Sequence, residues 1–412
     1  MLSASIRHEG SSKFAADNRW ANFWSATAGW RISNEEFMKD FDWLDDLKIR
    51  FGYGVTGNND FSATYMANML GSDTNWMMPN GTWAYSYGKS QNVNPNLGWE
   101  EKKEWNLGVD YSFFEGRLYG KFDYYRREVD NLLFSVKVPQ PPYTQGSQMQ
   151  NIGSMESKGW EFEVGGDIIR TKDFTWSSSM NLSHNTGKIL TLEGDNSYHN
   201  GNGFVAPGTP GDAARMEAGS TIGSFYMWKF AGFDDEGSFL LYNKDGEVIP
   251  AAQKTENDKQ YIGNYTPKLI IGWSHTLTYK NFDLGINLRS WIDFDVYNTI
   301  NMYYGIQGQG NLNVLKDAYG KFNHIKGEKQ ICDYFLEDGT FLKIDAITLG
   351  YTLPMKMYTN NLIDRIRIYG TVGNVCTITG YSGMNRRWIS RAGIKERKSS
   401  GAISIRSSVL GH

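Results

Sequence analysis

The stretch WEEKKEWNLGVDYSFFEGRLYGKFDYYRREVDNLLF, residues Trp99–Phe134, decides how the rest of the sequence is interpreted. From Trp105 to Phe113 every second residue is apolar, and the residues between them are Asn106, Gly108, Asp110 and Ser112. A period of two is typical of a strand with one apolar and one polar face. The alternation resumes after Glu115-Gly116, so the stretch predicts a long β-hairpin.

A two-residue turn at Glu115-Gly116 predicts the register of this hairpin, because glycine readily adopts the positive φ that such turns require. In that register Val109 lies opposite Phe122 on the apolar face. On the polar face Asp110 lies opposite Lys121, which is a favourable cross-strand pair. The question is whether the apolar face meets a second sheet or lipid.

Two further hairpins have the same two-faced pattern. Residues Trp160–His184 turn at Thr171-Lys172-Asp173, which predicts Ile168 opposite Trp176, and Leu269–Ser290 turn at Lys280-Asn281. In all three hairpins the central charges fall on the face opposite the apolar residues. Other alternating segments bring the total to eleven or twelve strands: Leu2–His8, Ala21–Ile32, Leu47–Thr56, Thr340–Leu353, Arg365–Thr379 and Ala402–Leu410.

The connections between these strands alternate between long and short along the chain. Outer-membrane barrels have short periplasmic turns and long outer loops, whereas Greek-key sandwiches do not separate loop lengths in this way. Strands of about ten residues also suit a tilted crossing of a bilayer. The pattern therefore predicts an all-β fold, an antiparallel up-and-down transmembrane β-barrel with long extracellular loops. Aromatic residues near strand ends fit interfacial girdles: Trp105, Tyr124, Trp160, Trp273 and Tyr351.

Composition supports a β-rich chain and excludes several classes. The 412 residues include 45 glycines, 10 prolines and 15% aromatic residues, which suits hairpins better than helical bundles. No apolar run approaches the ~18 residues of a membrane helix, but alternation hides a membrane barrel from hydropathy. The net charge of −3 gives no sign of a nucleic-acid partner. The two cysteines are expected to be unpaired thiols, and no signal peptide is recognisable.

The same stretches resemble the SusC/RagA family of TonB-dependent outer-membrane transporters. The resemblance rests on the order and spacing of six segments, which extend to about Gly383: AGWRISNEEFM with LKIRFGYGVTGN, NPNLGWEEKKEWNLGVDYSFFEGRL, NIGSMESKGWEFEV, YIGNYTPKLIIGWSHTLTYKNFDL, FLKIDAITLGYTLP and GTVGNVCTITGYSG. Each segment is loose alone, but the series is specific.

This resemblance implies a 22-strand barrel in the complete protein, with an N-terminal plug and a TonB box. It also implies a SusD-like surface lipoprotein as partner, the TonB complex as energy source, and oligosaccharides or peptides as cargo. No cofactor is expected. Residues 1–384 are interpreted as a partial barrel domain, because they supply roughly half the strands. No candidate plug precedes Leu2, so the sequence is expected to be an incomplete chain.

The last segment departs from the family pattern. Residues 385–412 read NRRWISRAGIKERKSSGAISIRSSVLGH, which is strongly basic, whereas family members usually end in a strand with a terminal aromatic residue. A shifted reading frame after about Met384 is the favoured explanation, and genuine divergence is the alternative.

Candidate ligand-binding residues lie in the expected outer loops. Four aromatic residues alternate with small polar groups and could stack on sugar rings or peptide side chains: Trp76, Trp83, Tyr85 and Tyr87. Tyr303 and Tyr304 form a weaker set. The alternative for both sets is packing within the loops or contact with a lipoprotein.

No pattern predicts an enzyme or a metal site. The six histidines are scattered and form no HExxH motif. Glu161 and Glu163 superficially suit a glycosidase, but a solvated lumenal face explains them better. A soluble or surface-exposed all-β carbohydrate-binding or adhesin protein remains the second hypothesis, because aromatic loops also suit that class.

Overall fold

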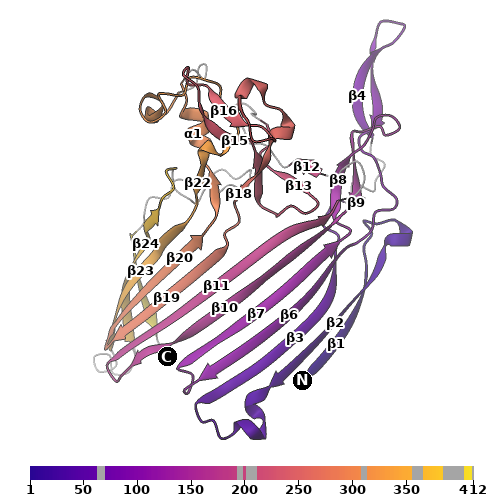
Figure 1. Ribbon diagram of the computed structural model, residues 1–412. Helices are drawn as coiled ribbons and strands as arrows, with labels where there is room; N and C mark the ends of the chain where they lie inside the picture. Colours follow the sequence, from indigo (N-terminus) through magenta and orange to yellow (C-terminus); the bar gives the residue numbers. More distant parts are fainter. Residues whose placement is uncertain are drawn as a thin grey trace.

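The main feature of the computed structural model is one antiparallel sheet of twelve strands (Figure 1). The structure describes residues 1–62, 70–192, 198–200, 211–307, 313–354, 365–383 and 403–410. In sheet order the strands are β1 (Leu2–Gly10), β2 (Trp20–Arg31), β3 (Leu44–Asn58), β6 (Glu100–Phe113), β7 (Leu118–Asp130), β10 (Ser154–Arg170), β11 (Phe174–Thr191), β19 (Leu269–Tyr279), β20 (Phe282–Ile292), β23 (Phe341–Pro354), β24 (Arg365–Thr379) and β25 (Ile403–Leu410).

These twelve strands are the alternating segments predicted from the sequence, in the predicted order. Each pairs with the next strand of the sheet along the chain, so the topology is up-and-down. The sheet curves strongly, with the larger connections gathered at one end and tight turns at the other (Figure 1). In the described chain it remains open, with β1 and β25 at its edges.

The register of two hairpins confirms the sequence prediction. In β6–β7, Val109 lies opposite Phe122, and the Arg117 N–H donates to the Phe114 carbonyl (3.2 Å) to close the Glu115-Gly116 turn. In β19–β20, Trp273 lies opposite Leu288. Turn chemistry and alternation together were therefore sufficient to define these pairings.

The β10–β11 hairpin differs from the prediction near its turn. Trp176 pairs with Ile169, because the turn consists of Lys172 and Asp173 alone and the Thr171 N–H donates to the Phe174 carbonyl. The extra residue, Ile168, is accommodated by a β-bulge. Beyond the bulge the register returns to the predicted one.

One connection also breaks the expected alternation of lengths. Residues 32–43, which join β2 and β3 at the tight-turn end, outnumber residues 11–19, which join β1 and β2 at the loop end. Residues 32–43 hold two short 3₁₀ turns, Ile32–Asn34 and Glu36–Met38.

The remaining elements form small sheets and one helix at the loop end. They are β4 (Leu70–Met77), β5 (Trp83–Lys89), β8 (Leu133–Lys137), β9 (Ser147–Asn151), β12 (Tyr198–Asn200), β13 (Arg215–Glu217), β14 (Ser224–Met227), β15 (Lys229–Phe233), β16 (Phe239–Tyr242), β17 (Val248–Pro250), β18 (Gln260–Asn264), β21 (Asp295–Tyr297), α1 (Thr299–Tyr304) and β22 (Leu336–Asp338). No helix among the described residues is long and apolar enough to cross a membrane.

The largest buried core lies in these loops. We use the name loop cluster for residues 211–264 and 294–338, apart from 308–312. Apolar side chains with no exposed surface fill its centre: Met227, Leu241, Met302, Ile306, Ile325 and Ile331. Within the loop cluster, β15 and β16 pair as a short hairpin.

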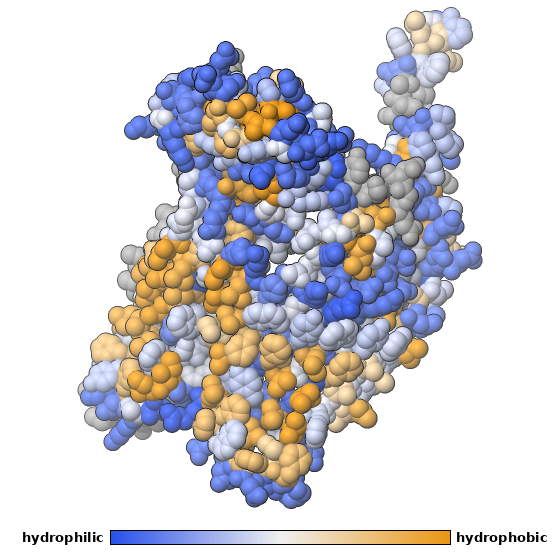
Figure 2. Space-filling model, in the orientation of Figure 1, coloured by the Kyte–Doolittle hydropathy of each residue, from blue (hydrophilic) through white to orange (hydrophobic). Residues whose placement is uncertain are grey.

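The twelve-stranded sheet has one apolar face and one polar face. Apolar residues at alternating positions share the outward face: Val109, Phe122, Phe162, Val164, Met180, Leu182, Leu277 and Leu284. Hydrophobic residues gather over the lower part of the sheet in Figure 2, below a hydrophilic upper region. Phe122 is 38% exposed, and no second sheet covers this face in the described part of the chain. The apolar face is therefore available to lipid.

A charge on the outward face tests this assignment. Val109→Arg should lower the unfolding free energy in bilayers by about 2–4 kcal/mol, because the guanidinium enters hydrocarbon. Thr276→Arg, on the inward face of β19, is the matched control and should change it by less than about 1 kcal/mol. Denaturant titration of the full-length protein in vesicles measures both variants. Equal losses would contradict the assignment of the two faces.

Candidate ligand path: the inward wall and the outer loops

The inward face of the sheet is a polar wall stabilised by ion pairs that cross strands. Arg50 of β3 makes a bidentate contact with Asp110 of β6, with Nε–Oδ2 and Nη2–Oδ1 distances of 2.8 Å. The same guanidinium lies 3.1 Å from Asp123 of β7. One arginine therefore connects three neighbouring strands, and a planar guanidinium suits this geometry.

Gly108 makes this three-strand contact possible. It lies in register with Arg50 on one side and with Asp123 on the other. A Cβ atom at Gly108 would lie 2.6 Å from the Asp123 Oδ1 and 2.7 Å from the Arg50 Cζ. The guanidinium thus passes over β6 through the space that a Cβ at Gly108 would occupy.

A similar arrangement recurs on the same inward face, nearer the β25 edge of the sheet. Arg367 of β24 passes over Gly350 of β23 and donates from Nε to Asp283 Oδ1 of β20 (2.9 Å). A Cβ at Gly350 would lie 2.5 Å from both Asp283 carboxylate oxygens. We call each of these Arg–Gly–Asp arrangements a glycine saddle.

The predicted pair of Asp110 and Lys121 is placed in register, but its charges have other partners. The two residues lie directly opposite one another in β6–β7. Asp110 binds Arg50, as described above, and Lys121 lies 3.2 Å from Glu163 of β10. Each residue of the expected pair therefore binds an opposite charge on a strand outside the β6–β7 hairpin, β3 for Asp110 and β10 for Lys121. The sequence pattern places Arg50 on the inward face, but only the strand order shows which acids it reaches.

The four predicted aromatic residues all lie on the β4–β5 hairpin, which projects from the loop end (Figure 1). Trp83, Tyr85 and Tyr87 alternate along β5 and share one face, and they are 67%, 72% and 68% exposed. Trp76 lies opposite Ala84, so it occupies the other face. Three of the four rings therefore form one exposed aromatic strip.

The weaker pair lies in a different environment. Tyr303 is only 3% exposed and packs in the core of the loop cluster, while Tyr304 is half-buried. Both are on α1, whose N-cap residue Asn298 accepts a hydrogen bond from the Asn301 N–H (3.0 Å). The burial of Tyr303 fits the alternative of packing within the loops, and a binding role for this pair stays a prediction.

The loop cluster is attached to the end of the barrel sheet by a carboxylate. Glu337 accepts hydrogen bonds from the Asn298 side-chain amide (2.8 Å) and from the Ser382 N–H and hydroxyl (2.7 Å each). Ser382 lies three residues beyond the end of β24, and Asn298 is the N-cap of α1, so this contact joins α1 to the end of the sheet. The cluster is thereby held over one side of the loop end.

A second carboxylate stabilises the cluster internally. Asp258 is buried and accepts hydrogen bonds from the Thr255 hydroxyl and N–H (2.7 Å each) and from the Lys244 N–H (3.0 Å). The Thr255 hydroxyl above all holds the pKa of this carboxyl below its ordinary value. In the same cluster, burial raises the thiol pKa of Cys332 to about 12.

Nothing in this arrangement resembles a catalytic centre. Glu163 is neutralised by Lys121, and Glu161 lies on the same inward strand face. In the part of the chain that the structure describes, no group of three His, Cys, Asp or Glu side chains is placed to hold a metal ion. The geometry offers hydrogen bonds, charges and aromatic surfaces for binding.

Comparison with known proteins then decides the family. Residues 1–298 match the family described as TonB dependent receptor-like, beta-barrel. The TonB-dependent receptor SusC of Bacteroides thetaiotaomicron is 32% identical over 93% of this chain and 39% of its own length. The chain belongs to the TonB-dependent receptor β-barrel family and lies in the outer membrane.

Other relatives agree with this assignment. The TonB-dependent receptor P3 of Formosa agariphila is 30% identical over 92% of this chain and 39% of its own length. The solved RagAB peptide transporter superposes with a TM-score of 0.77 at 26% identity, covering 93% of this chain and 42% of that one. The chain spans about two fifths of the length of the relatives it matches. These relatives are receptors and transporters rather than enzymes, and the hypothesis of a soluble adhesin has no support among them.

The expected boundary at residue 384 stays a prediction. Residues 384–402 lie outside the described chain, while the weakly alternating segment after them is present as β25, in register with β24.

A methyl group in a glycine saddle should weaken the inward wall. Gly108→Ala is expected to lower the unfolding free energy by about 1 kcal/mol, because it separates Arg50 from Asp123 in a partly exposed site. Gly370→Ala is the matched control, since a Cβ at Gly370 of β24 meets nothing within 4 Å. Denaturant titration in vesicles compares the two. Identical stabilities would show that the saddle contributes nothing.

The buried carboxylate gives a pH dependence. The lowered pKa of Asp258 means that its stabilisation is present above the ordinary aspartate pKa of about 4 and is lost as the pH falls through the folded-state value. Asp258→Asn should loosen the loop cluster by about 1 kcal/mol at pH 7 and reduce this acid dependence. Maleimide labelling of buried Cys332 in the full-length protein reports the opening of the cluster. Asp245→Asn, at an exposed turn, should label at the unaltered rate.

Proposed function

We propose that the protein containing this chain is a SusC-like importer that takes up oligosaccharides or peptides across the outer membrane with energy from TonB. The observation that supports it most is the 32% identity with the TonB-dependent receptor SusC along 93% of this chain. The similarity to the RagAB peptide transporter adds peptides to the candidate cargo.

The aromatic strip on β5 is the proposed point of first contact with the cargo. Its three rings are about two-thirds exposed, and the β4–β5 hairpin that carries them projects from the loop end (Figure 1). Aromatic faces bind the apolar faces of sugars and the side chains of peptides, with about 0.5–1.5 kcal/mol per ring beyond area burial. Beyond the loops, the inward wall offers carboxylates, guanidinium groups and hydroxyls along the path toward the tight-turn end.

The proposed partners follow from the family and from the two ends of the sheet. A SusD-like lipoprotein would cover the loop end, where the loop cluster and the aromatic hairpin lie. The TonB complex would act from the periplasm, at the end with the tight turns. The charge and composition of the chain provide no argument for a nucleic-acid partner.

Substitution of the aromatic strip tests the proposed role in binding. Trp83→Ala with Tyr85→Ala should weaken cargo binding by about tenfold, since two stacking contacts are lost. Phe41→Ala is the matched control, because Phe41 is an exposed aromatic residue at the opposite end, between β2 and β3. Isothermal titration of the full-length protein with an oligosaccharide panel and a peptide panel measures the effect.

The two panels separate the two cargo classes. Saturable binding from one panel only, reduced by the double substitution, would assign the cargo to that class. Unchanged affinity in the double variant would remove the aromatic strip from the binding site. Binding to neither panel, together with normal membrane insertion, would contradict the proposed import of oligosaccharides or peptides.

A further inference from the structure

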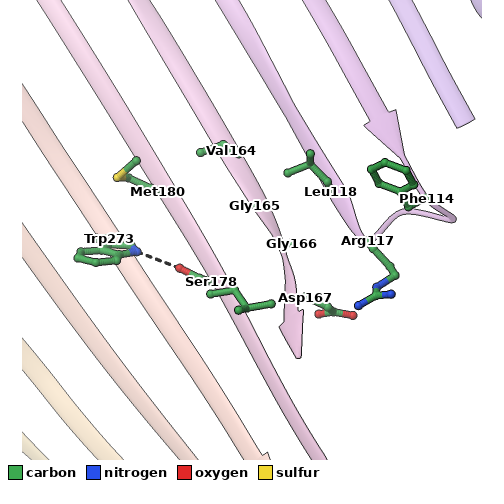
Figure 3. A pocket seen from close by; sticks show the side chains of 11 residues that line it. Phe114, Arg117, Leu118, Val164, Gly165, Gly166, Asp167, Ser178, Met180 and Trp273 are labelled. Carbon is green, nitrogen blue, oxygen red and sulfur yellow. Dashed lines mark hydrogen bonds between the residues drawn. The ribbon is translucent and has the colours of Figure 1, made fainter. Parts of the chain in front are cut away.

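An apolar groove lies on the outward face near the tight-turn end, away from the proposed cargo path (Figure 3). It encloses about 470 Å³ and runs from the β6–β7 turn across β10 and β11 to Trp273 on β19. Leu118, Val164 and Met180 line it on the side that faces lipid.

The floor of the groove is bare backbone because a side chain cannot be accommodated there. A Cβ at Gly166 would lie 2.2 Å from the Arg117 carbonyl oxygen. That same carbonyl accepts a hydrogen bond from the Asp167 N–H (2.9 Å), which holds the β10 backbone close to the turn. Next to it, the bulged residue Ile168 is 52% exposed and raises one edge of the depression. The groove is therefore built by the backbone.

One wall of the groove is held by a specific contact. The Trp273 indole N–H donates to the Ser178 hydroxyl oxygen (2.9 Å), and Figure 3 shows the ring beside Met180. This hydrogen bond satisfies the two polar atoms that the lining would otherwise present to hydrocarbon. What remains is apolar surface, broken only at the end beside the turn.

The positively charged side chain of Arg117 lies at that end. It is exposed, and no carboxylate pairs with it among the residues that the structure describes. The neighbouring Asp167 already accepts from the Ser177 hydroxyl (2.6 Å) and lies 3.6 Å from Arg170, so part of its negative charge is neutralised. The rim of the groove can thus bind an anionic group.

We propose that this groove binds one glycerophospholipid of the inner leaflet of the outer membrane, with an acyl chain along Val164 and Met180 and the phosphate at Arg117. An apolar groove at bilayer depth can hold an acyl chain, because its lining gives the chain surroundings as apolar as the bilayer itself. The tight turns of this fold face the periplasm, so Arg117 lies at the level of inner-leaflet headgroups. The same chemistry occurs in lipid A, whose phosphates belong to the outer leaflet.

Native mass spectrometry of the full-length protein in mild detergent tests the proposal. With added phosphatidylglycerol, one lipid should remain bound at collision energies that remove all others. Arg117→Ala should weaken its apparent affinity about fivefold, as expected for one basic residue at a membrane surface. Met180→Trp should abolish retention by filling the groove. Lys280→Ala, in the β19–β20 turn outside the groove, should retain the lipid as the unaltered protein does.

Three results would overturn the proposal. They are equal retention by all variants, a preference for lipid A over phosphatidylglycerol, and occupancy by detergent only. Heat-modifiable migration of each variant shows whether its barrel is folded, so that loss of lipid is not confused with loss of structure.

Discussion

In hydrocarbon every backbone N–H and C=O group has to be bonded within the protein, and this constraint governs the whole sheet. The ten inner strands, β2 to β24 in the sheet, satisfy it by pairing with a neighbouring strand on both sides, and β1 and β25 do so on one side. Such a ladder presents alternate side chains to opposite faces. The requirement that Val109 and Phe122 meet lipid therefore also places Asp110 and Lys121 on the inward wall. The lipid face and the polar path are two consequences of one alternation.

The polar wall is in turn organised by charge neutralisation. Acids on this wall that are partly shielded from water need cationic partners, and a partner on the adjacent strand is not always in reach. The glycine saddles solve this geometrically, because Arg50 and Arg367 each pass over a strand to reach an aspartate beyond it. The Arg50 saddle joins side chains of three strands, and the Arg367 saddle joins β24 to β20 across β23. The wall is thus cross-linked by side chains as well as by its backbone ladder.

Short-range patterns were enough to predict the strands. They were not enough to predict the contacts between residues far apart in sequence. Alternation and turn residues gave the registers around Val109 and Trp273, because both depend on a few adjacent residues. The bulge at Ile168 escaped prediction, since a three-residue turn and a two-residue turn with a bulge need the same number of residues. The role of Gly108 depends on strands far apart in sequence. The burial of Tyr303 depends on packing within a cluster assembled from several loops.

The two aromatic sets in the loops differ in how much of their surface is already buried. Tyr303 packs in the core of the loop cluster, and this packing alone explains an aromatic residue at that position. The rings of Trp83, Tyr85 and Tyr87 remain about two-thirds exposed on one face of a hairpin. Each forgoes on the order of 1–2 kcal/mol of burial in this state. A contiguous exposed strip of this kind marks an interaction surface. A partner that covered the strip would gain this burial energy, whereas Tyr303 on α1 has already buried its ring. This difference is the physical reason for proposing the binding role for β5.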